Sequence, residues 1–281
     1  DPVCVDAISF NLNGQPTGGV YTGQGIIDTL SGSFDPSTAG VGTHEIVYNF
    51  ENTDGCANSD TILIVVNALP IVNLSDAGPF CIDEASENLE GIPIGGVFSG
   101  SGIIDMSSGT FDPSVAGSGS HTIVYSIVDA NGCMNSDSIE IIVNSLPVID
   151  FISTGPLCID SPVQDLMATP EGGLFSGNGI TDNSLGTFDP MVAGVDTHTI
   201  IYNYTDPNGC SNSDSIEIVV DSLPVPEIIA VDSICIGNGI DTLVATPPGG
   251  IFSGNGIIDD TLGIFDPSVA GVGTSTITYD I

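Results

Sequence analysis

The residues from Phe111 to Tyr125 read FDPSVAGSGSHTIVY, and this stretch decides the fold. Asp112 can cap a short helical turn, the proline after it suits the first position of that turn, and Gly117 suits a left-handed exit. Apolar and polar residues then alternate, with Ile123 on the same face as the tyrosine, which indicates a half-buried β-strand. The stretch therefore predicts a capped turn that feeds a strand.

This stretch occurs four times, at intervals of 77 residues. Its Phe-Asp-Pro tripeptides begin at Phe34, Phe111, Phe188 and Phe265. A period of this length with its own apolar runs indicates a string of domains rather than a solenoid of short repeats. We therefore predict four copies, at residues 1–67, 68–144, 145–221 and 222–281, with the first and last incomplete. We also expect the sequence to be part of a longer protein.

Within the second copy, short strands are expected between frequent turn residues. Leu69-Pro70 marks the joint with the first copy, because proline stops strand pairing, and Asn131-Gly132 predicts a hairpin. The expected strands include 71–74, 80–83, 87–94, 95–100, 122–129 and 138–144, of which 87–94 is the weakest; residues 101–105 continue through a turn, and 109–111 lead into the Asp-Pro turn. About seven short strands and no helix longer than a turn predict an all-β chain, a tandem array of immunoglobulin-like β-sandwich repeats.

The charge of the chain is one-sided. It contains no Lys or Arg and 36 Asp and Glu residues, for a net charge of −36. This excludes nucleic acid as a partner, because that requires a basic surface, and it argues against docking on anionic lipid. No apolar run reaches the roughly 18 residues of a membrane span. Hydrophobic residues make up 41% of the chain and gather in strand-length runs, so the acidic composition does not indicate disorder.

The seven cysteines form two series with the same period. The leading cysteines are Cys4, Cys81, Cys158 and Cys235, and the hairpin cysteines are Cys56, Cys133 and Cys210. No Cys-x-x-Cys motif is present, so disulfides in an oxidising compartment are expected rather than a zinc site. We predict bonds within a copy, because a small domain needs its own crosslink: Cys4–Cys56, Cys81–Cys133 and Cys158–Cys210, with Cys235 unpaired. The alternative joins neighbouring copies as Cys56–Cys81, Cys133–Cys158 and Cys210–Cys235.

The sequence offers no catalytic constellation. Histidine stands at one register in three copies, His44, His121 and His198, and the fourth copy has Ser275 there. We therefore expect an exposed strand position rather than a catalyst. No nucleophile elbow or paired-carboxylate cleft is visible, and the glycine strings lack the lysine and the following helix of a phosphate loop. The chain is not expected to be an enzyme.

Calcium is the one candidate cofactor. An aspartate precedes each Asp-Pro aspartate by seven residues, which gives the pairs Asp28 and Asp35, Asp105 and Asp112, Asp182 and Asp189, and Asp259 and Asp266. Carboxylate oxygens suit Ca²⁺. The Asp-Pro aspartates already have a capping role, however, and no EF-hand spacing occurs, so plain turn chemistry is the favoured interpretation of all eight.

The order of motifs is specific to a repeat type. Gly-Gly-x-Phe-Ser-Gly-x-Gly-Ile is followed by Phe-Asp-Pro-x-x-Ala-Gly-x-Gly-Thr-His-Thr-Ile-x-Tyr and then by Asn-Gly-Cys-x-Asn-Ser-Asp. The series resembles the tandem immunoglobulin-like repeats of giant cell-surface adhesins of Bacteroidota, which serve gliding and attachment and leave the cell by type IX secretion. The resemblance covers the whole sequence.

The resemblance implies an extracellular location on the cell surface and structural or adhesive work. The implied function is a repeat shaft or surface filament that displays a distal adhesive region, and the alternative is a carbohydrate- or calcium-binding module. The implied partners are neighbouring repeats, other protomers if a filament forms, and a surface or glycan ligand at an unseen tip. The same group carries O-linked glycans on Asp-Ser/Thr motifs before an apolar residue, which implies glycans on Thr61, Ser138 and Ser215.

Overall fold

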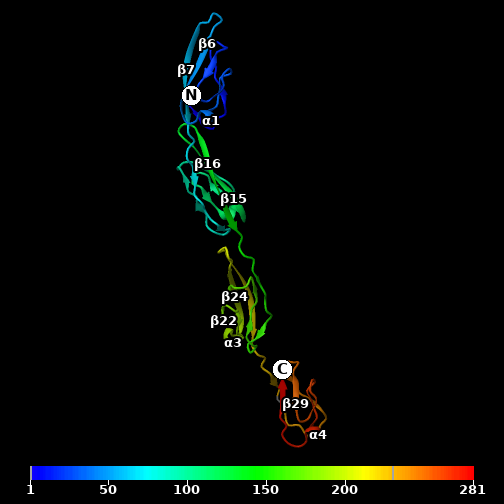
Figure 1. Ribbon diagram of the computed structural model, residues 1–281. Helices are drawn as coiled ribbons and strands as arrows, with labels where there is room; N and C mark the ends of the chain where they lie inside the picture. Colours follow the sequence, from blue (N-terminus) through cyan, green and yellow to red (C-terminus); the bar gives the residue numbers. More distant parts are fainter. Residues whose placement is uncertain (1, 230) are drawn as a thin grey trace. The chain divides into compact units, whose positions relative to one another are not determined.

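The computed structural model describes residues 2–229 and 231–281 (Figure 1). The chain is an all-β tandem array of immunoglobulin-like β-sandwich repeats, and its helices are single turns. Contacts divide it into two compact units, residues 1–147 with 205–211, and residues 148–204 with 212–281. Each sheet of the described residues takes its strands from one copy. The division into four domains stays a prediction.

The second copy shows the full sandwich. One sheet has the order β12-β15-β16-β9, in which β9 runs parallel to β16 and the other pairs are antiparallel. A three-stranded sheet β10-β14-β13 and the pair β11-β8 complete it. The elements are β8 (Asn73–Leu74), β9 (Phe80–Cys81), β10 (Glu87–Asn88), β11 (Gly91–Ile92), β12 (Val97–Ser99), β13 (Ile103–Asp105), β14 (Thr110–Phe111), α2 (Pro113–Ala116), β15 (Gly119–Val128) and β16 (Met134–Asn144).

The third copy repeats this plan, and the first copy has the four-stranded sheet β1-β7-β6-β3 and the three-stranded sheet β2-β5-β4. The first has β1 (Val3–Cys4), β2 (Phe10–Asn11), β3 (Val20–Thr22), β4 (Ile26–Asp28), β5 (Ser33–Phe34), α1 (Pro36–Ala39), β6 (Gly42–Glu51) and β7 (Ala57–Asn67). The third has β17 (Asp150–Phe151), β18 (Leu157–Cys158), β19 (Gln164–Asp165), β20 (Ala168–Thr169), β21 (Leu174–Ser176), β22 (Ile180–Asp182), β23 (Thr187–Phe188), α3 (Pro190–Ala193), β24 (Asp196–Thr205) and β25 (Ser211–Asp221).

The fourth copy has a smaller main sheet. Its elements are β26 (Glu227–Ile228), β27 (Asp241–Thr242), β28 (Ala245–Thr246), β29 (Ile251–Gly254), β30 (Ile257–Asp259), β31 (Ile264–Phe265), α4 (Pro267–Ala270) and β32 (Ile277–Asp280). Among the described residues, its main sheet consists of β29 and β32, whereas the corresponding sheets of the other copies have four strands.

The capped turn forms as predicted. The side chain of Asp112 accepts a hydrogen bond from the backbone N–H of Ser114 at 2.9 Å, and Pro113 occupies the first helical position. Gly117 leaves the turn with a φ of +81°, and its N–H donates to the carbonyl of Pro113 at 3.0 Å. The equivalent turns α1, α3 and α4 have the same aspartate cap and the same glycine exit.

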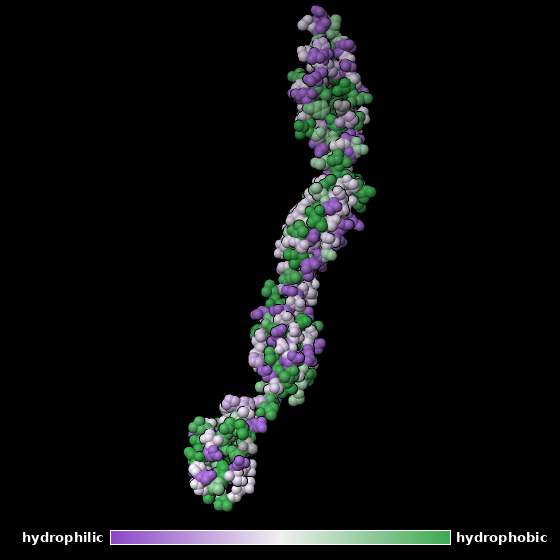
Figure 2. All heavy atoms as spheres, turned by 180° about the vertical axis from the view of Figure 1, so that it is seen from behind, coloured by the Kyte–Doolittle hydropathy of each residue, from purple (hydrophilic) through white to green (hydrophobic). Residues whose placement is uncertain are grey.

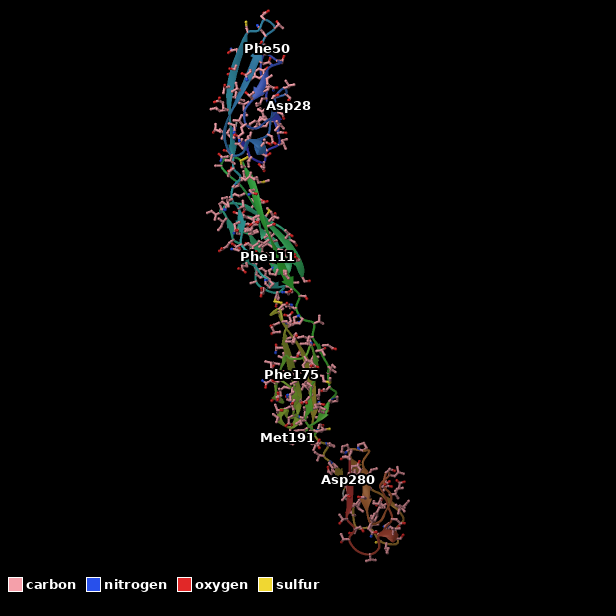
Figure 3. All side chains as sticks on the ribbon, in the orientation of Figure 1. Asp28, Phe50, Phe111, Phe175, Met191 and Asp280 are labelled. Carbon is pink, nitrogen blue, oxygen red and sulfur yellow. A yellow bond between two sulfur atoms is a disulfide. The ribbon has the colours of Figure 1, made fainter. Side chains whose placement is uncertain are left out.

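Each copy has an aromatic core behind this turn. In the second copy Phe111 has 0% of its surface exposed and Tyr125 has 1%; Figure 3 shows Phe111 among the strands of that copy. The rings of Phe98 and Tyr125 lie 4.5 Å apart. The buried hydroxyl of Tyr125 donates to the carbonyl of Pro93 and accepts from the N–H of Gly96, the latter at 2.8 Å. The tyrosine therefore fixes the glycine turn before β12 to the core.

The strands differ from the prediction in length and in grouping. The hairpin β15–β16 pairs continuously from Gly119 with Val143 to Val128 with Met134, so both strands begin earlier than the apolar alternation indicated. The weak strand predicted at 87–94 is instead two strands in different sheets, because β10 pairs with β14 while β11 pairs with β8.

The surface mixes apolar and polar side chains. Figure 2 shows hydrophobic residues on the visible face of each copy, among hydrophilic residues. One exposed hydrophobic residue is Ile142, which lies on the outer face of β16 between the buried Ile141 and Val143. None of the helices in residues 2–229 and 231–281 has the length and apolar character to cross a membrane.

Candidate functional site: the disulfide-bonded hairpin tips

Two disulfides join cysteines of different copies. Cys4 is bonded to Cys133, and Cys81 is bonded to Cys210, each across 129 residues of sequence. In both bonds a leading cysteine meets the hairpin cysteine of the following copy. The predicted pairing within a copy is therefore wrong, and the alternative pairing at the shorter spacing is wrong as well.

The strand directions explain why a bond within a copy does not form. Cys81 ends β9, and the parallel register places it beside Asn144, the last residue of β16. Cys133 directly precedes Met134, the first residue of the same strand. An 11-residue strand is roughly 35 Å long, whereas a disulfide needs Cα atoms within about 7 Å. The two cysteines of one copy therefore lie at opposite ends of its longest strand.

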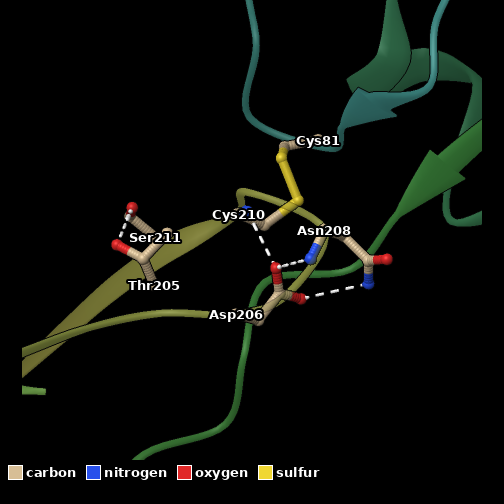
Figure 4. The surroundings of a disulfide bond; sticks show 6 residues. All are labelled: Cys81, Thr205, Asp206, Asn208, Cys210 and Ser211. Carbon is tan, nitrogen blue, oxygen red and sulfur yellow. Dashed lines mark hydrogen bonds between the residues drawn. A yellow bond between two sulfur atoms is a disulfide. The ribbon is translucent and has the colours of Figure 1, made fainter. Parts of the chain in front are cut away.

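The hairpin tip is built around an aspartate. Asp206 accepts hydrogen bonds from the N–H groups of Asn208 and Cys210, both at 2.9 Å, and from the Asn208 side-chain amide at 3.3 Å (Figure 4). The N–H of Asp206 donates to the carbonyl of Cys210 at 2.9 Å, and that of Gly209 donates to the carbonyl of Asp206 at 3.0 Å. Cys210 is fully buried in the resulting joint with Cys81. These bonds fix the position of the sulfur.

The second copy has the same tip, since Asp129 accepts from the N–H groups of Asn131 and Cys133 at 2.9 Å. The five-residue tips of the first three copies are closed in the same way: the backbone N–H of the first residue donates to the carbonyl of the cysteine at the end. The bonded hairpin cysteines, Cys133 and Cys210, are both fully buried, whereas the unbonded Cys56 is exposed. Sequence reasoning missed this site because it placed each hairpin cysteine against its own copy.

The eight aspartates proposed as calcium ligands each serve a turn. In the second copy, backbone N–H groups of Ser107 and Ser108 donate to Asp105 at 2.8 and 3.2 Å and lower its pKa. The hydroxyl of Ser114 donates to Asp112 at 2.7 Å and is the main cause of the lowered pKa of that carboxyl. The equivalent aspartates, Asp28, Asp35, Asp182, Asp189, Asp259 and Asp266, also accept bonds within their own turns.

No metal-binding cluster accompanies these turns. Within the described ranges, no three or more His, Cys, Asp or Glu side chains gather in a way that could hold an ion. The turn bonds give these aspartates a structural role, and the calcium site stays a prediction.

The cap at Asp112 leads to a prediction about pH. Asp112→Ala should lower the hydrogen-exchange protection of the second copy a few-fold at pH 7, while Asp112→Asn should keep most of it, because asparagine also caps well. The carboxyl of Asp112 has a lowered pKa in the folded chain, so its ionised form stabilises the fold. This stabilisation is complete above the pKa of about 4 that the carboxyl has in the unfolded chain, and it is lost as the pH falls through the folded pKa.

The exchange difference between the native chain and Asp112→Ala should therefore narrow at low pH. The difference between the asparagine and alanine variants should persist, because the asparagine does not titrate. Protection factors of peptides from residues 97–143 measure both differences. An unchanged difference between the native and alanine chains at low pH would contradict the assignment.

The histidines are not exposed strand residues, contrary to the expectation from the sequence. His44 and His198 are buried, with 9% and 8% of their surfaces exposed, and His121 is half-buried. Nε2 of each ring donates at 2.8 Å to the carbonyl of the glycine that ends the helical turn, which is Gly40, Gly117 or Gly194. The rings satisfy carbonyls that the end of a helical turn leaves free, so their role is structural.

The three residues implied as glycan carriers are exposed. Thr61, Ser138 and Ser215 lie in β7, β16 and β25, and the N–H of each donates to the preceding aspartate side chain at 2.8 to 2.9 Å. Ser138 and Ser215 precede buried isoleucines, so their hydroxyls lie on the outer face. The positions are accessible, and glycosylation itself stays a prediction.

No protein family model matches the sequence, and no curated protein matches it. Among solved structures, the chain is similar to the first four extracellular domains of Drosophila N-cadherin, at 10% identity and a TM-score of 0.25, over 99% of this chain and 97% of that one. It is also similar to a Ca²⁺-stabilised, ice-binding adhesin of an Antarctic bacterium, at 12% identity and a TM-score of 0.32, over 96% and 91%.

A third similar structure comprises domains 3–6 of protocadherin gamma B2, at 9% identity and a TM-score of 0.28, over 99% of this chain and 92% of that one. Likenesses of this size do not place the chain in a family.

Proposed function

We propose that the chain is part of the repeat shaft of an extracellular adhesin or surface filament, and that it displays a distal adhesive region. The observation that carries the proposal is the pair of staggered disulfides, because each bonds one copy to the next through buried hairpin cysteines. A binding module needs a pocket or a ligand-facing loop in each copy. Here the hairpin loops of the second and third copies are occupied by the joints.

The chemistry of the bonds supports an extracellular location. Disulfides persist outside the reducing cytosol, and a chain without Lys or Arg offers trypsin-like proteases no cleavage site. Uniform negative charge also keeps neighbouring shafts apart. The motif order adds the narrower proposal that the shaft is of the type found in gliding and attachment adhesins of Bacteroidota that use type IX secretion, with glycans on Thr61, Ser138 and Ser215.

Two measurements test the proposal. Antibodies against this chain should label intact cells of the source organism, and label confined to permeabilised cells would refute a surface location. The purified chain should bind neither glycan arrays nor surfaces that the cells colonise, because a shaft carries its adhesive region elsewhere. Saturable binding of a glycan, or heat released on titration with calcium, would favour the binding module instead.

A further inference from the structure

We propose that Asn238 is a site of spontaneous deamidation, in which water converts its side-chain amide to a carboxylate through a cyclic imide formed with Gly239. Asparagine before glycine is prone to this reaction, because glycine has no side chain to hinder its backbone nitrogen. The sequence contains six Asn-Gly dipeptides, which begin at Asn13, Asn131, Asn178, Asn208, Asn238 and Asn255. At five of them a hydrogen bond holds one of the two reacting groups, and Asn238 is the exception.

The reaction requires the two groups to meet. The backbone nitrogen of Gly239 attacks Cγ of Asn238, the bond from Cγ to the amide nitrogen breaks, and the proton of the glycine N–H leaves with that nitrogen as ammonia. Water then opens the cyclic imide at either carbonyl, which gives aspartate or isoaspartate and adds one negative charge. A bond that holds the glycine N–H or the side-chain amide opposes ring closure, because the reaction then waits for the local structure to open.

At the hairpin tips the glycine nitrogen is held. The N–H of Gly132 donates to the carbonyl of Asp129 at 3.1 Å, and that of Gly209 donates to the carbonyl of Asp206 at 3.0 Å. The side-chain amide of Asn208 also donates to Asp206, at 3.3 Å (Figure 4). The asparagines of both tips are exposed, so bonding rather than burial protects them.

In the glycine turns of the third and fourth copies the amide itself is held. Asn178 donates to the carbonyl of Ala193 at 2.7 Å, and Asn255 donates to that of Ala270 at 2.8 Å. The glycines that follow are buried, and a methyl group on them would lie 2.5 and 2.4 Å from Cε2 of a phenylalanine. Each side chain would have to leave its bond and approach a nitrogen with no space around it.

The dipeptide at Asn13 is held at its glycine. The N–H of Gly14 donates to the hydroxyl of Tyr21, and this hydroxyl donates in turn to the carbonyl of Leu12 at 3.0 Å. A methyl group on Gly14 would lie 2.7 Å from the ring of Tyr48. The attacking nitrogen is therefore bonded and enclosed.

Neither kind of bond is present at Asn238. Across residues 2–229 and 231–281, the side chain of Asn238 and the N–H of Gly239 have no hydrogen-bond partner. Both residues are exposed, and a methyl group on Gly239 would meet no atom within 4 Å. The backbone N–H of Asn238 donates to the carbonyl of Cys235 at 2.9 Å, which forms the turn without restraining the reacting groups.

The second copy has the same open turn in a repeat whose main sheet has four strands. The N–H of Glu84 donates to the carbonyl of Cys81 at 3.1 Å, and in the part of the chain that the structure describes the N–H of the exposed Ala85 has no partner. The open nitrogen therefore belongs to the repeated turn. Glu84 occupies the position of Asn238 and is exposed, so the turn accommodates the carboxylate that deamidation produces.

The rate of amide loss at each dipeptide tests the proposal. The folded chain is incubated in mildly alkaline buffer and sampled over time, and mass spectrometry of peptic fragments follows all six asparagines. Asn238 should lose its amide several times faster than each of the other five, and electron-transfer fragmentation should find both aspartate and isoaspartate there. A hairpin asparagine that reacts as fast as Asn238 would overturn the proposal, and so would an Asn238 that keeps its amide as long as Asn255.

The reduced and denatured chain separates the effect of the fold from that of the local sequence. All six asparagines should then react at similar rates, because the bonds that protect five of them are gone. A preference for Asn238 that persists in the denatured chain would overturn the structural explanation. The result does not depend on the adhesive role, because labelling of cells tests that role separately.

Two variants test the cause directly. Gly239→Ala hinders the attacking nitrogen and should slow the loss at Asn238 severalfold, without changing the other five rates. Asp129→Ala loosens one hairpin tip and should speed the loss at Asn131, while Asn208 stays slow as the reference in the same chain. Retention of the Cys4–Cys133 bond in the digest shows that this variant is folded. An unchanged rate at Asn131 would mean that the tip bonds do not control the reaction, and it would overturn the proposal.

Discussion

Replacing Phe111 with alanine should lower the free energy of unfolding of the second copy by about 3 to 5 kcal/mol. Phe111 ends β14, its ring is fully buried with its centroid 5.6 Å from that of Phe80, and its removal leaves a cavity in the core. Hydrogen exchange of the whole chain measures the effect. Peptides from residues 97–143 should lose protection by at least a hundredfold, since each 1.4 kcal/mol corresponds to about tenfold.

The controls for this prediction lie in the same chain. Val115→Ala changes a residue of the adjacent turn α2 that is 59% exposed, so it should alter protection little. Phe111→Leu should recover part of the loss, because it refills part of the cavity. Peptides of the third copy, residues 157–204, serve as the internal reference. Equal effects of the Phe111 and Val115 changes would show that the ring does not support the core.

Gly102→Ala should destabilise the second copy by about 2 to 4 kcal/mol, because backbone strain and overpacking add. Gly102 has a φ of +89°, and a methyl group there would lie 2.5 Å from Cε2 of Phe111 and 2.7 Å from Cβ of Ala116. Neither neighbour can move without disturbing the capped turn or the core. Exchange protection of the same peptides measures the loss.

Gly95→Ala separates the two contributions. Gly95 has a similar φ of +97°, and a methyl group there would meet no atom within 4 Å. This variant should lose only the roughly 1 to 2 kcal/mol of stability that it costs to hold an alanine in a left-handed backbone conformation. The Gly102 variant should therefore exchange faster by a further factor of about ten or more. Identical effects at both positions would mean that the contact with Phe111 does not matter.

Local patterns in the sequence predicted the capped turn and the strand that follows it. The Asp-Pro turn, its glycine exit and the alternation after it specify backbone conformations directly, and all of them are present in the structure. The strand at 87–94 was wrong because its two halves pair with different partners, which no local pattern records. Pairing between distant strands is decided by packing, and packing is not visible in a single sequence.

The site was the part that the sequence predicted least well. The predicted disulfides within a copy were wrong, because both observed bonds join neighbouring copies. The missing information was direction, because parallel pairing places Cys81 at the far end of β16 from Cys133. The histidines were misplaced for a related reason: the partner of each ring is a carbonyl at the end of a turn, which becomes available only when the chain folds.

The staggered bonds set a limit on how far the chain can be stretched. Cys4 and Cys210 are 206 residues apart (210 minus 4), and a fully extended chain of that length would reach about 720 Å. With both bonds intact, tension passes from Cys4 to Cys133, back along 52 residues (133 minus 81) to Cys81, and then to Cys210. That route is only about 180 Å long even if every strand along it has unfolded. The two disulfide loops overlap between residues 81 and 133, so a force applied between Cys4 and Cys210 can extend only those 52 residues (133 minus 81), and the two covalent bonds then bear the load.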